Sequence, residues 1–202
     1  GRYLQYQVHN CDLRGDQAYL YDRGIFPLAF AEVEADQSSL KYNLLDSVES
    51  VDYQIPPLRK MKIHVDVAKK GKIANLNDPI DKIVANQADN EILIDSGNEK
   101  EKLLQLVHVV KELDPDIVLT RGGDSYLFPY LARRALINDI LSEFVLSRDE
   151  IPLVAKYMRG RTYFSYGRTY YRAPTRRLYG RIHIDENNTF ILSECGIEGL
   201  IE

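Results

Sequence analysis

The 202-residue chain has little that would place it in a membrane or in a disulfide-bonded scaffold. No apolar run approaches the roughly 18 residues of a membrane span. Only two cysteines occur, Cys11 and Cys195, without metal-ligand spacing, which is typical of a reducing, cytoplasmic compartment. Neither an initiator methionine nor an apolar signal core stands at the start. We therefore expect a piece of a longer protein.

Acidic residues are missing from one long segment, Lys156–Arg181. This segment contains one lysine, seven arginines and six of the fourteen tyrosines. It carries a charge of +8 in a chain whose net charge is −4, so the remaining residues carry −12. The modest overall charge therefore hides a strongly basic region.

Cations and aromatic rings interleave in this segment over two short strands, Thr162–Tyr166 and Thr169–Tyr171. Gly167-Arg168 is a suitable two-residue connection for a hairpin. Cations hold phosphates and rings stack on bases, so the pattern predicts contact with single-stranded nucleic acid. The alternative is an ordinary hairpin whose alternate rings face the core, because tyrosine is common in strands. The residues that we expect to contact DNA are Arg161, Tyr163, Tyr166, Arg168, Tyr170, Tyr171, Arg172, Arg176 and Arg177.

Three short strands are predicted after the Pro56-Pro57 pair. Met61–Val67 alternates between apolar and polar residues, and Lys82–Asn86 and Glu91–Asp95 follow. Ser96 with Glu99 has the pattern of a capping box. Apolar residues at helical spacing then predict a helix that ends at Leu113.

A further strand and helix complete an α/β pattern. The apolar run Asp116–Thr120 predicts a buried strand that turns on two glycines. Asp124 or Ser125 could cap the helix that follows over Tyr130–Asp139. The order of elements predicts an α/β (α+β) mixed sheet of about five strands, with Met61–Val67 and Asp116–Thr120 adjacent and central.

Residues 1–57 form a separate first unit in this prediction. Tyr3–Val8 is strand-like, and Asp12 could cap a helix through Tyr21 that Gly24 stops. Leu40–Ile55 has a mixed strand-like pattern.

Two motifs carry a resemblance to a known family. The segment Gly123–Ala135, G-D-S-Y-L-F-P-Y-L-A-R-R-A, resembles the second exonuclease motif of family-B DNA polymerases, Y-N-G-D-x-F-D-F-P-Y-L. The segment Gly180–Asp185, G-R-I-H-I-D, resembles a strand that follows the hairpin of that family. The resemblance is to a divergent archaeal group with degenerate active sites.

The resemblance implies a ribonuclease H-like 3′–5′ exonuclease domain over residues 58–202, cut short in its last helix. It implies an incomplete, β-rich N-terminal domain over residues 1–57. The parent chain would be a DNA-directed DNA polymerase that uses Mg²⁺ or Mn²⁺, with single-stranded or primer–template DNA and other replication proteins as partners. The polymerase palm motifs do not occur in this chain.

The family's metal ligands are mostly replaced here. Where the first motif has D-x-E, this chain has Asp66 and Ala68, and Leu127 stands at the Asp of the second motif. The third motif aligns with Glu194–Glu198, so Glu198 replaces an Asp. Asp66 and Glu198 are thus vestigial catalytic positions, and we expect no bound metal or other cofactor in this fragment, because Mg²⁺ needs several well-placed anions. Leu127 should be buried.

Two other functions stay open from the sequence. One is an active metal-dependent exonuclease whose rearranged ligands include Asp124 or Asp185. The other is a structural or protein-interaction scaffold of a replication protein. His64, His108 and His183 lie on predicted elements and are expected to be structural or surface residues.

Overall fold

The computed structural model describes residues 14–27, 29–47, 49, 56–69, 71, 75–153, 157–172 and 174–188. The chain divides into two compact units, Gly1–Pro57 and Leu58–Glu202. The division falls directly after the Pro56-Pro57 pair. In the described part of the chain, no helix is both long and apolar enough to cross a membrane.

The first unit contains one helix and one hairpin. Helix α1 (Gly15–Arg23) ends at Gly24, whose φ of 63° gives the left-handed C-cap that glycine adopts without strain. Strands β1 (Ala31–Ala35) and β2 (Leu40–Leu44) pair antiparallel. None of the described residues in this unit is buried. The expected strand Tyr3–Val8 and the cap Asp12 lie outside the described residues.

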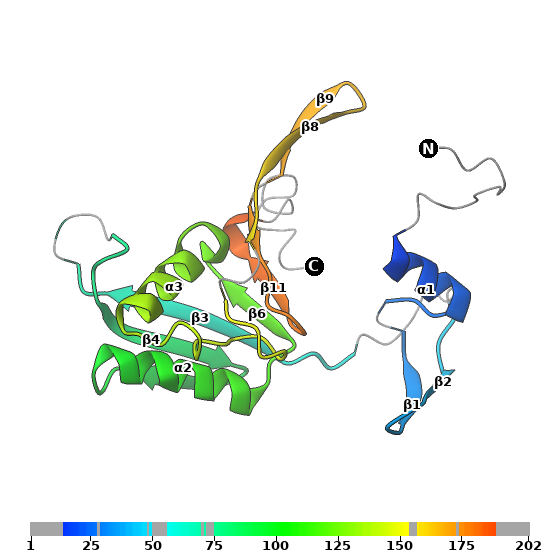
Figure 1. The fold of residues 1–202 in the computed structure, drawn as a ribbon, viewed down its shortest axis with the longest axis horizontal. Helices are drawn as coiled ribbons and strands as arrows, with labels where there is room; N and C mark the ends of the chain where they lie inside the picture. The colour runs from blue at the N-terminus through cyan, green and yellow to red at the C-terminus, as the bar shows by residue number, and fades with distance from the viewer. Residues whose placement is uncertain are drawn as a thin grey trace. The chain divides into compact units, whose positions relative to one another are not determined.

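A five-stranded mixed sheet forms the centre of the second unit, in the order β11-β6-β3-β4-β5 (Figure 1). Strand β4 (Ile80–Gln87) pairs antiparallel with β3 (Lys60–Val67) on one side and with β5 (Asn90–Ile94) on the other. Strand β6 (Ile117–Thr120) is parallel to β3, and β11 (Ile182–Asp185) is parallel to β6. This confirms the mixed sheet and the adjacent, interior positions of the two predicted strands.

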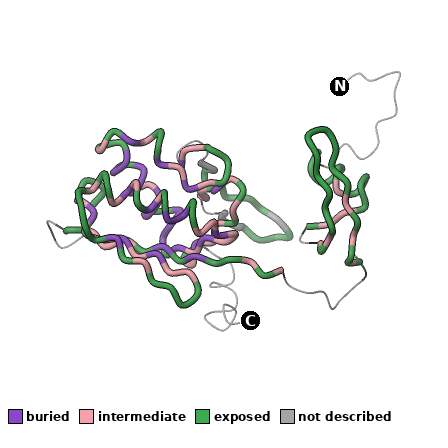
Figure 2. Tube along the Cα trace, turned by 90° about the horizontal axis from the view of Figure 1, so that it is seen from below, coloured by how far each residue is buried: buried purple, intermediate pink, exposed green. Residues whose placement is uncertain are grey.

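Strand alternation decides which face of this sheet is buried. In β3, Met61 and Ile63 are buried whereas Lys62 and His64 are exposed, as a period of two requires. In Figure 2 the buried residues follow the strands and the inner faces of the helices of this unit.

Helix α2 (Glu99–Leu113) buries Leu103, Leu106, Val109 and Val110 against the sheet. Its capping box was expected at Ser96 and Glu99 but lies two residues later. The side chain of Asn98 accepts from the Glu101 amide at 3.0 Å, and Glu101 accepts from the Asn98 amide at 2.8 Å. Glu99 instead forms a buried ion pair with Arg134 of the next helix. Glu99 is thus engaged in a long-range pair and not in the cap.

A π-helical turn, η1 (Gly123–Leu127), leads from β6 into helix α3 (Phe128–Ile137). Gly122 adopts a φ of 74° before the turn, which suits a residue without Cβ. Pro129 lies in the first turn of α3, as expected. The buried face of α3 includes Leu131 and Ala135.

A two-stranded hairpin of β8 (Arg161–Ser165) and β9 (Arg168–Arg172) projects from the second unit (Figure 1). Below it, the short strands β7 (Tyr157–Met158) and β10 (Thr175–Arg176) pair antiparallel. The turn residues are Tyr166 and Gly167, with φ of 49° and 77°, and not Gly167-Arg168. Two positive φ values suit the twist of a two-residue hairpin. A short 3-10 helix, η2 (Glu186–Asn188), follows β11.

Candidate nucleic-acid interface

Asp66, the retained residue of the first motif, lies in β3 with 42% of its side chain exposed. Its Oδ1 is 3.1 Å from Nε2 of His64, and its Oδ2 is 3.4 Å from Nζ of Lys82 on the neighbouring strand. Both carboxylate oxygens therefore have partners within the sheet. This arrangement makes Asp66 a surface ion-pair residue.

Leu127 occupies the position where the family has a metal-binding Asp. It ends the π-helical turn and is 5% exposed, as part of the hydrophobic core. The expected burial of Leu127 is confirmed. An apolar side chain packed in this way cannot supply an oxygen ligand for a divalent cation.

Asp124 and Asp185 are buried, but both hold backbone groups. Asp185 accepts from the amides of Gly122 and Asp124, each at 2.8 Å. It therefore fixes the start of η1. Asp124 accepts from the amide of Arg176 at 2.5 Å, and it lies inside η1, whose N-cap is Gly122. The expectation that Asp124 caps the following helix is therefore wrong, because strand β10, at the base of the hairpin, approaches its side chain.

Within the described ranges, no three metal-binding side chains come together. Glu198 and the rest of the third motif lie outside those ranges. The described residues at the first two motifs do not fit a divalent metal, because Asp66 is paired and Leu127 is apolar.

His183 lies in the core between β6 and the base of the hairpin. Its Nε2 is 2.8 Å from Oγ1 of Thr120, and its Nδ1 is 3.2 Å from the carbonyl oxygen of Arg176. Burial lowers the pKa of His183, whereas the nearby charge of Asp124 opposes that shift. The histidine is structural, as the sequence predicts. Its contact with the hairpin base has no local sequence signal, because 7 residues separate the partners and no helix connects them.

The hairpin exposes its aromatic residues on both faces. The exposed fractions are 45% for Tyr163, 73% for Phe164, 99% for Tyr166 and 70% for Tyr171. Tyr163 and Phe164 are sequence neighbours and point to opposite faces. The alternative hairpin, in which alternate rings face the core, is therefore wrong for the side chains that the structure describes. The hairpin projects from the body of the domain, and its described aromatic side chains are exposed on both faces.

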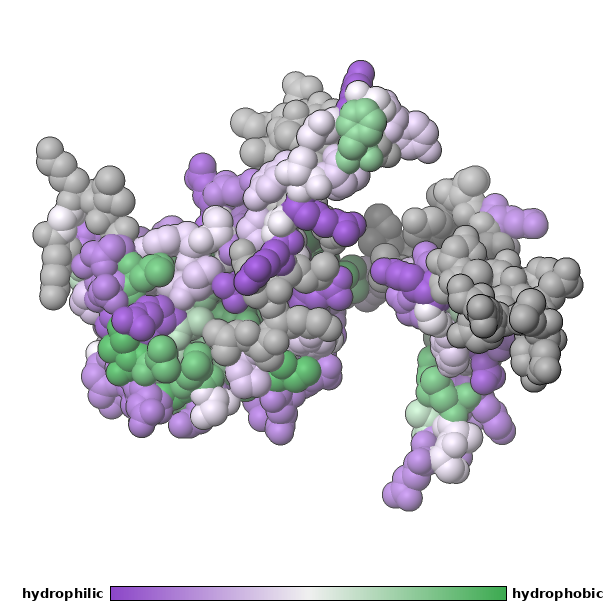
Figure 3. All heavy atoms as spheres, turned by 45° about the horizontal axis from the view of Figure 1, so that its top comes forward, coloured by the Kyte–Doolittle hydropathy of each residue, from purple (hydrophilic) through white to green (hydrophobic). Residues whose placement is uncertain are grey.

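Exposed arginines lie on the hairpin and just after β10. Arg161, Arg168 and Arg177 are exposed, and no carboxylate among the described residues forms an ion pair with them. In Figure 3 hydrophobic and hydrophilic side chains stand together on the projecting hairpin. Arg176 is half-buried at the hairpin base, beside a pocket of about 420 Å³. The side chains of Tyr170 and Arg172 lie outside the described part.

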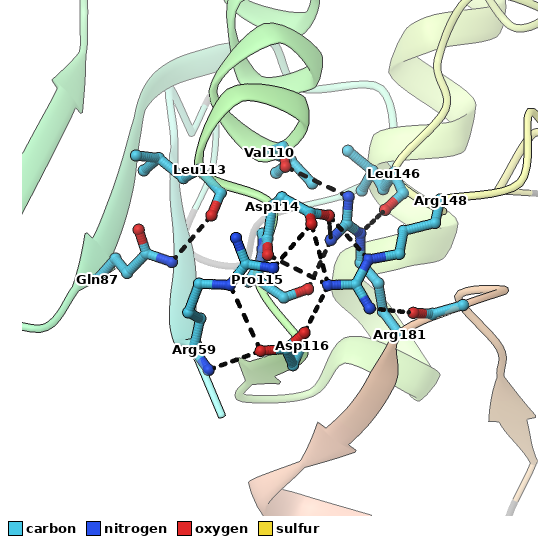
Figure 4. Close-up of polar contacts among 11 residues, drawn as sticks. Arg59, Gln87, Val110, Leu113, Asp114, Pro115, Asp116, Leu146, Arg148 and Arg181 are labelled. Atoms are coloured by element: carbon cyan, nitrogen blue, oxygen red, sulfur yellow. Dashed lines mark hydrogen bonds and ion pairs between the residues drawn. The ribbon is translucent and has the colours of Figure 1, made fainter. Parts of the chain in front are cut away.

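Arg181 belongs to the basic segment by sequence but not by structure (Figure 4). Its side chain is 3% exposed, and Nη1 is 2.7 Å from Oδ1 of Asp114. Arg148 binds the same carboxylate at 2.8 Å, and Arg59 binds its other oxygen at 2.8 Å. We name the set Arg59, Asp114, Asp116, Arg148 and Arg181 the ion-pair network.

The network holds together several segments that are distant in sequence. Arg148 also binds Asp116, at 2.5 Å, and the amide of Arg59 donates to Asp116 at 2.8 Å. These hydrogen bonds lower the pKa of Asp116 to about 2, with Arg148 as the main cause. The same kind of bonding, again mainly from Arg148, holds the pKa of Asp114 well below its usual range.

No family profile matches the chain. It is 35% identical over 89 residues to a DNA polymerase of Thermococcus litoralis, covering 44% of this chain and 4% of that protein. A DNA polymerase of Methanocaldococcus jannaschii is 26% identical over 191 residues, covering 89% of this chain and 10% of the relative. The chain thus spans a small part of the length of these relatives.

The fold has a match among solved structures. The family B DNA polymerase of Pyrobaculum calidifontis superposes with a TM-score of 0.60 at 23% identity, over 92% of this chain and 23% of that chain. The architecture is therefore that of an α/β region of a family B polymerase. Together with the archaeal DNA polymerases among the sequence relatives, this confirms the resemblance carried by Gly123–Ala135 and Gly180–Asp185.

Proposed function

We propose that this chain is the ribonuclease H-like, exonuclease-type region of a DNA polymerase, and that it binds DNA without 3′–5′ hydrolysis. The observation that carries the proposal is the projecting hairpin, whose rings are exposed on both faces beside exposed arginines. A hairpin built for packing would bury one of those faces.

The hairpin chemistry fits a single strand. Guanidinium groups bind phosphate oxygens, and the exposed rings offer flat surfaces for unpaired bases, which stack with about 1–3 kcal/mol each. Neither contact reads a base edge, so binding does not depend on sequence. Tyr166, 99% exposed at the turn, is the most accessible of the rings.

The proposed loss of hydrolysis follows from the residues at the first two exonuclease motifs. Two-metal hydrolysis needs carboxylates that converge on a pair of cations. In this chain Asp66 is engaged by His64 and Lys82, and Leu127 is part of the core. Asp124 and Asp185, the candidates for rearranged ligands, are engaged with backbone amides.

The whole parent protein is proposed to be a DNA-directed DNA polymerase, because the relatives carry that name. Its nucleotidyl transfer, with Mg²⁺ or Mn²⁺, would reside in parts that this chain does not contain.

Binding of labelled single-stranded DNA, measured by fluorescence anisotropy at low salt, tests the proposal. The variant Arg161→Ala/Arg168→Ala/Arg177→Ala should bind far more weakly than the wild type. Lys100→Ala, which removes an exposed cation from α2, is the control and should change little. Equal affinities for the triple variant and the wild type would contradict DNA binding by the hairpin. They would favour a structural or protein-interaction scaffold instead.

A further inference from the structure

The amide and the carbonyl group of Arg176 are each held by a buried side chain. Arg176 lies in β10, opposite Tyr157 of β7, at the base of the β8–β9 hairpin. Its amide donates to Oδ1 of Asp124 at 2.5 Å, and its carbonyl is 3.2 Å from Nδ1 of His183. In an antiparallel pair, one residue directs its amide and carbonyl to the same side. Arg176 therefore directs both groups toward the body of the domain.

The two holding side chains are themselves fixed. The amide of Asp124 donates to Oδ2 of Asp185 at 2.8 Å, and Nε2 of His183 is 2.8 Å from Oγ1 of Thr120. The side chains of Asp124 and His183 are 6% and 3% exposed. A buried carboxylate is costly unless it accepts hydrogen bonds. The amide of Arg176 is therefore one of the partners that stabilise the buried Asp124 carboxylate.

Hydrogen-bond chemistry assigns the histidine tautomer. A carbonyl oxygen only accepts, so Nδ1 of His183 carries the proton that it donates to Arg176. Nε2 then accepts from the hydroxyl of Thr120. A Cβ at Gly123 would collide with the Thr120 side chain and with the His183 ring. The cluster is therefore tightly packed against the π-helical turn.

We propose that Asp124 and His183 are positioning residues that lock the base of the hairpin to η1 and β11. They touch no DNA themselves. By fixing Arg176 they fix the direction in which the rings and cations of the hairpin project. The consequence for DNA rests on the proposed function, whereas the lock itself does not.

Hydrogen exchange of the Arg176 amide, followed by NMR in the whole chain, tests the lock. Asp124→Ala removes the acceptor, and the amide should exchange about 10- to 100-fold faster, because a bond to a charged acceptor is lost. Asp124→Asn keeps an oxygen at the same position and should restore most of the protection. The amides of β3 serve as the control for folding and should be unchanged in both variants.

Affinity for single-stranded DNA supplies the second measurement. Release of the hairpin base from Asp124 should weaken binding of single-stranded DNA by about two- to tenfold. The reason is that the hairpin must then be ordered when DNA binds. Tyr166→Ala should reduce the affinity for single-stranded DNA less in the Asp124→Ala background than in the wild type. In a released hairpin, Tyr166 at the tip is no longer held in position to stack on a base. His183→Phe keeps a ring 4.6 Å from Phe128 but loses the donor, and should act in the same direction.

The two proposals fail in different ways. The lock is overturned if the Arg176 amide exchanges at the same rate in Asp124→Ala and in the wild type. This holds whatever the affinity for single-stranded DNA. A wild-type chain that binds no DNA overturns the proposed function, while the exchange rates still decide the lock. Faster exchange in Asp124→Ala together with rescue by Asp124→Asn supports the lock.

Discussion

Two arginine-rich regions of the second unit use the same residue type in opposite ways. In the ion-pair network, Arg59, Arg148 and Arg181 share two aspartates and hold together segments that are distant in sequence. On the hairpin, Arg161 and Arg168 are exposed beside rings, without a carboxylate partner among the described residues. Position relative to Asp114 and Asp116, and not local charge, therefore decides whether an arginine stabilises the fold or remains available to a ligand.

The largest expected difference between the two regions is in stability, when Arg181 of the ion-pair network is replaced. Arg181→Met is expected to lower the free energy of unfolding by about 2–4 kcal/mol, because a buried charge partner and several hydrogen bonds are lost together. The carbonyls of Leu146 and Pro115 lose their donor in the same variant. Urea denaturation measures the change. The control Arg177→Met alters an exposed residue of the same segment and should stay within about 0.5 kcal/mol.

Removal of a ring should affect DNA and not stability. Tyr166→Ala is expected to weaken binding of single-stranded DNA by about 1–3 kcal/mol, with an unchanged dependence on salt. Tyr21→Ala is the control, since Tyr21 is 71% exposed in the first unit. If both substitutions weaken binding equally, stacking at the hairpin tip is not the cause.

Removal of one hairpin cation should change the dependence on salt. Each phosphate contact contributes about −0.7 to the slope of log K against log salt for single strands. Arg168→Ala should therefore flatten the slope by less than one unit and weaken all sequences alike. A loss that differs between homopolymers would instead indicate base recognition.

A fall in pH should reduce the stability contributed by the ion-pair network before it affects the hairpin. The pKa of Asp116 is lowered from 3.8 to about 2 in the folded chain, mainly by Arg148. The unfolded chain therefore binds more protons between these values, so stability falls as the pH falls. The contribution is present above about pH 4 and is lost toward pH 2.

The control for this loss is Asp116→Asn. Its unfolding free energy should decline less than that of the wild type between about pH 4 and pH 2, as followed by urea denaturation at each pH. Parallel declines in the two proteins would show that Asp116 is not a source of the acid sensitivity.

Local sequence patterns predicted the elements of the second unit well. The alternation of Met61 and Ile63 with Lys62 and His64 determines the buried face of β3, and no distant residue is needed to recognise it. The burial of Leu127 was likewise predictable, because an apolar side chain at that position favours the core.

The errors involve partners that are far away in the sequence. Glu99 pairs with Arg134 and Asp124 binds the backbone of Arg176, so neither acts as the cap that its local pattern suggests. Arg181 belongs to the basic segment by sequence, although Asp114, 67 residues away, neutralises it. Such pairings depend on strand order, which local spacing does not encode.

The central claim, DNA binding without hydrolysis, is tested most directly by a single incubation. Labelled single-stranded DNA is mixed with the chain and Mn²⁺ at low salt, separated by native electrophoresis, and the shifted DNA is recovered and sized. We expect a shifted band whose DNA keeps its full length. DNA that is progressively shortened from its 3′ end by the wild type, but not by Asp66→Ala, would contradict the account.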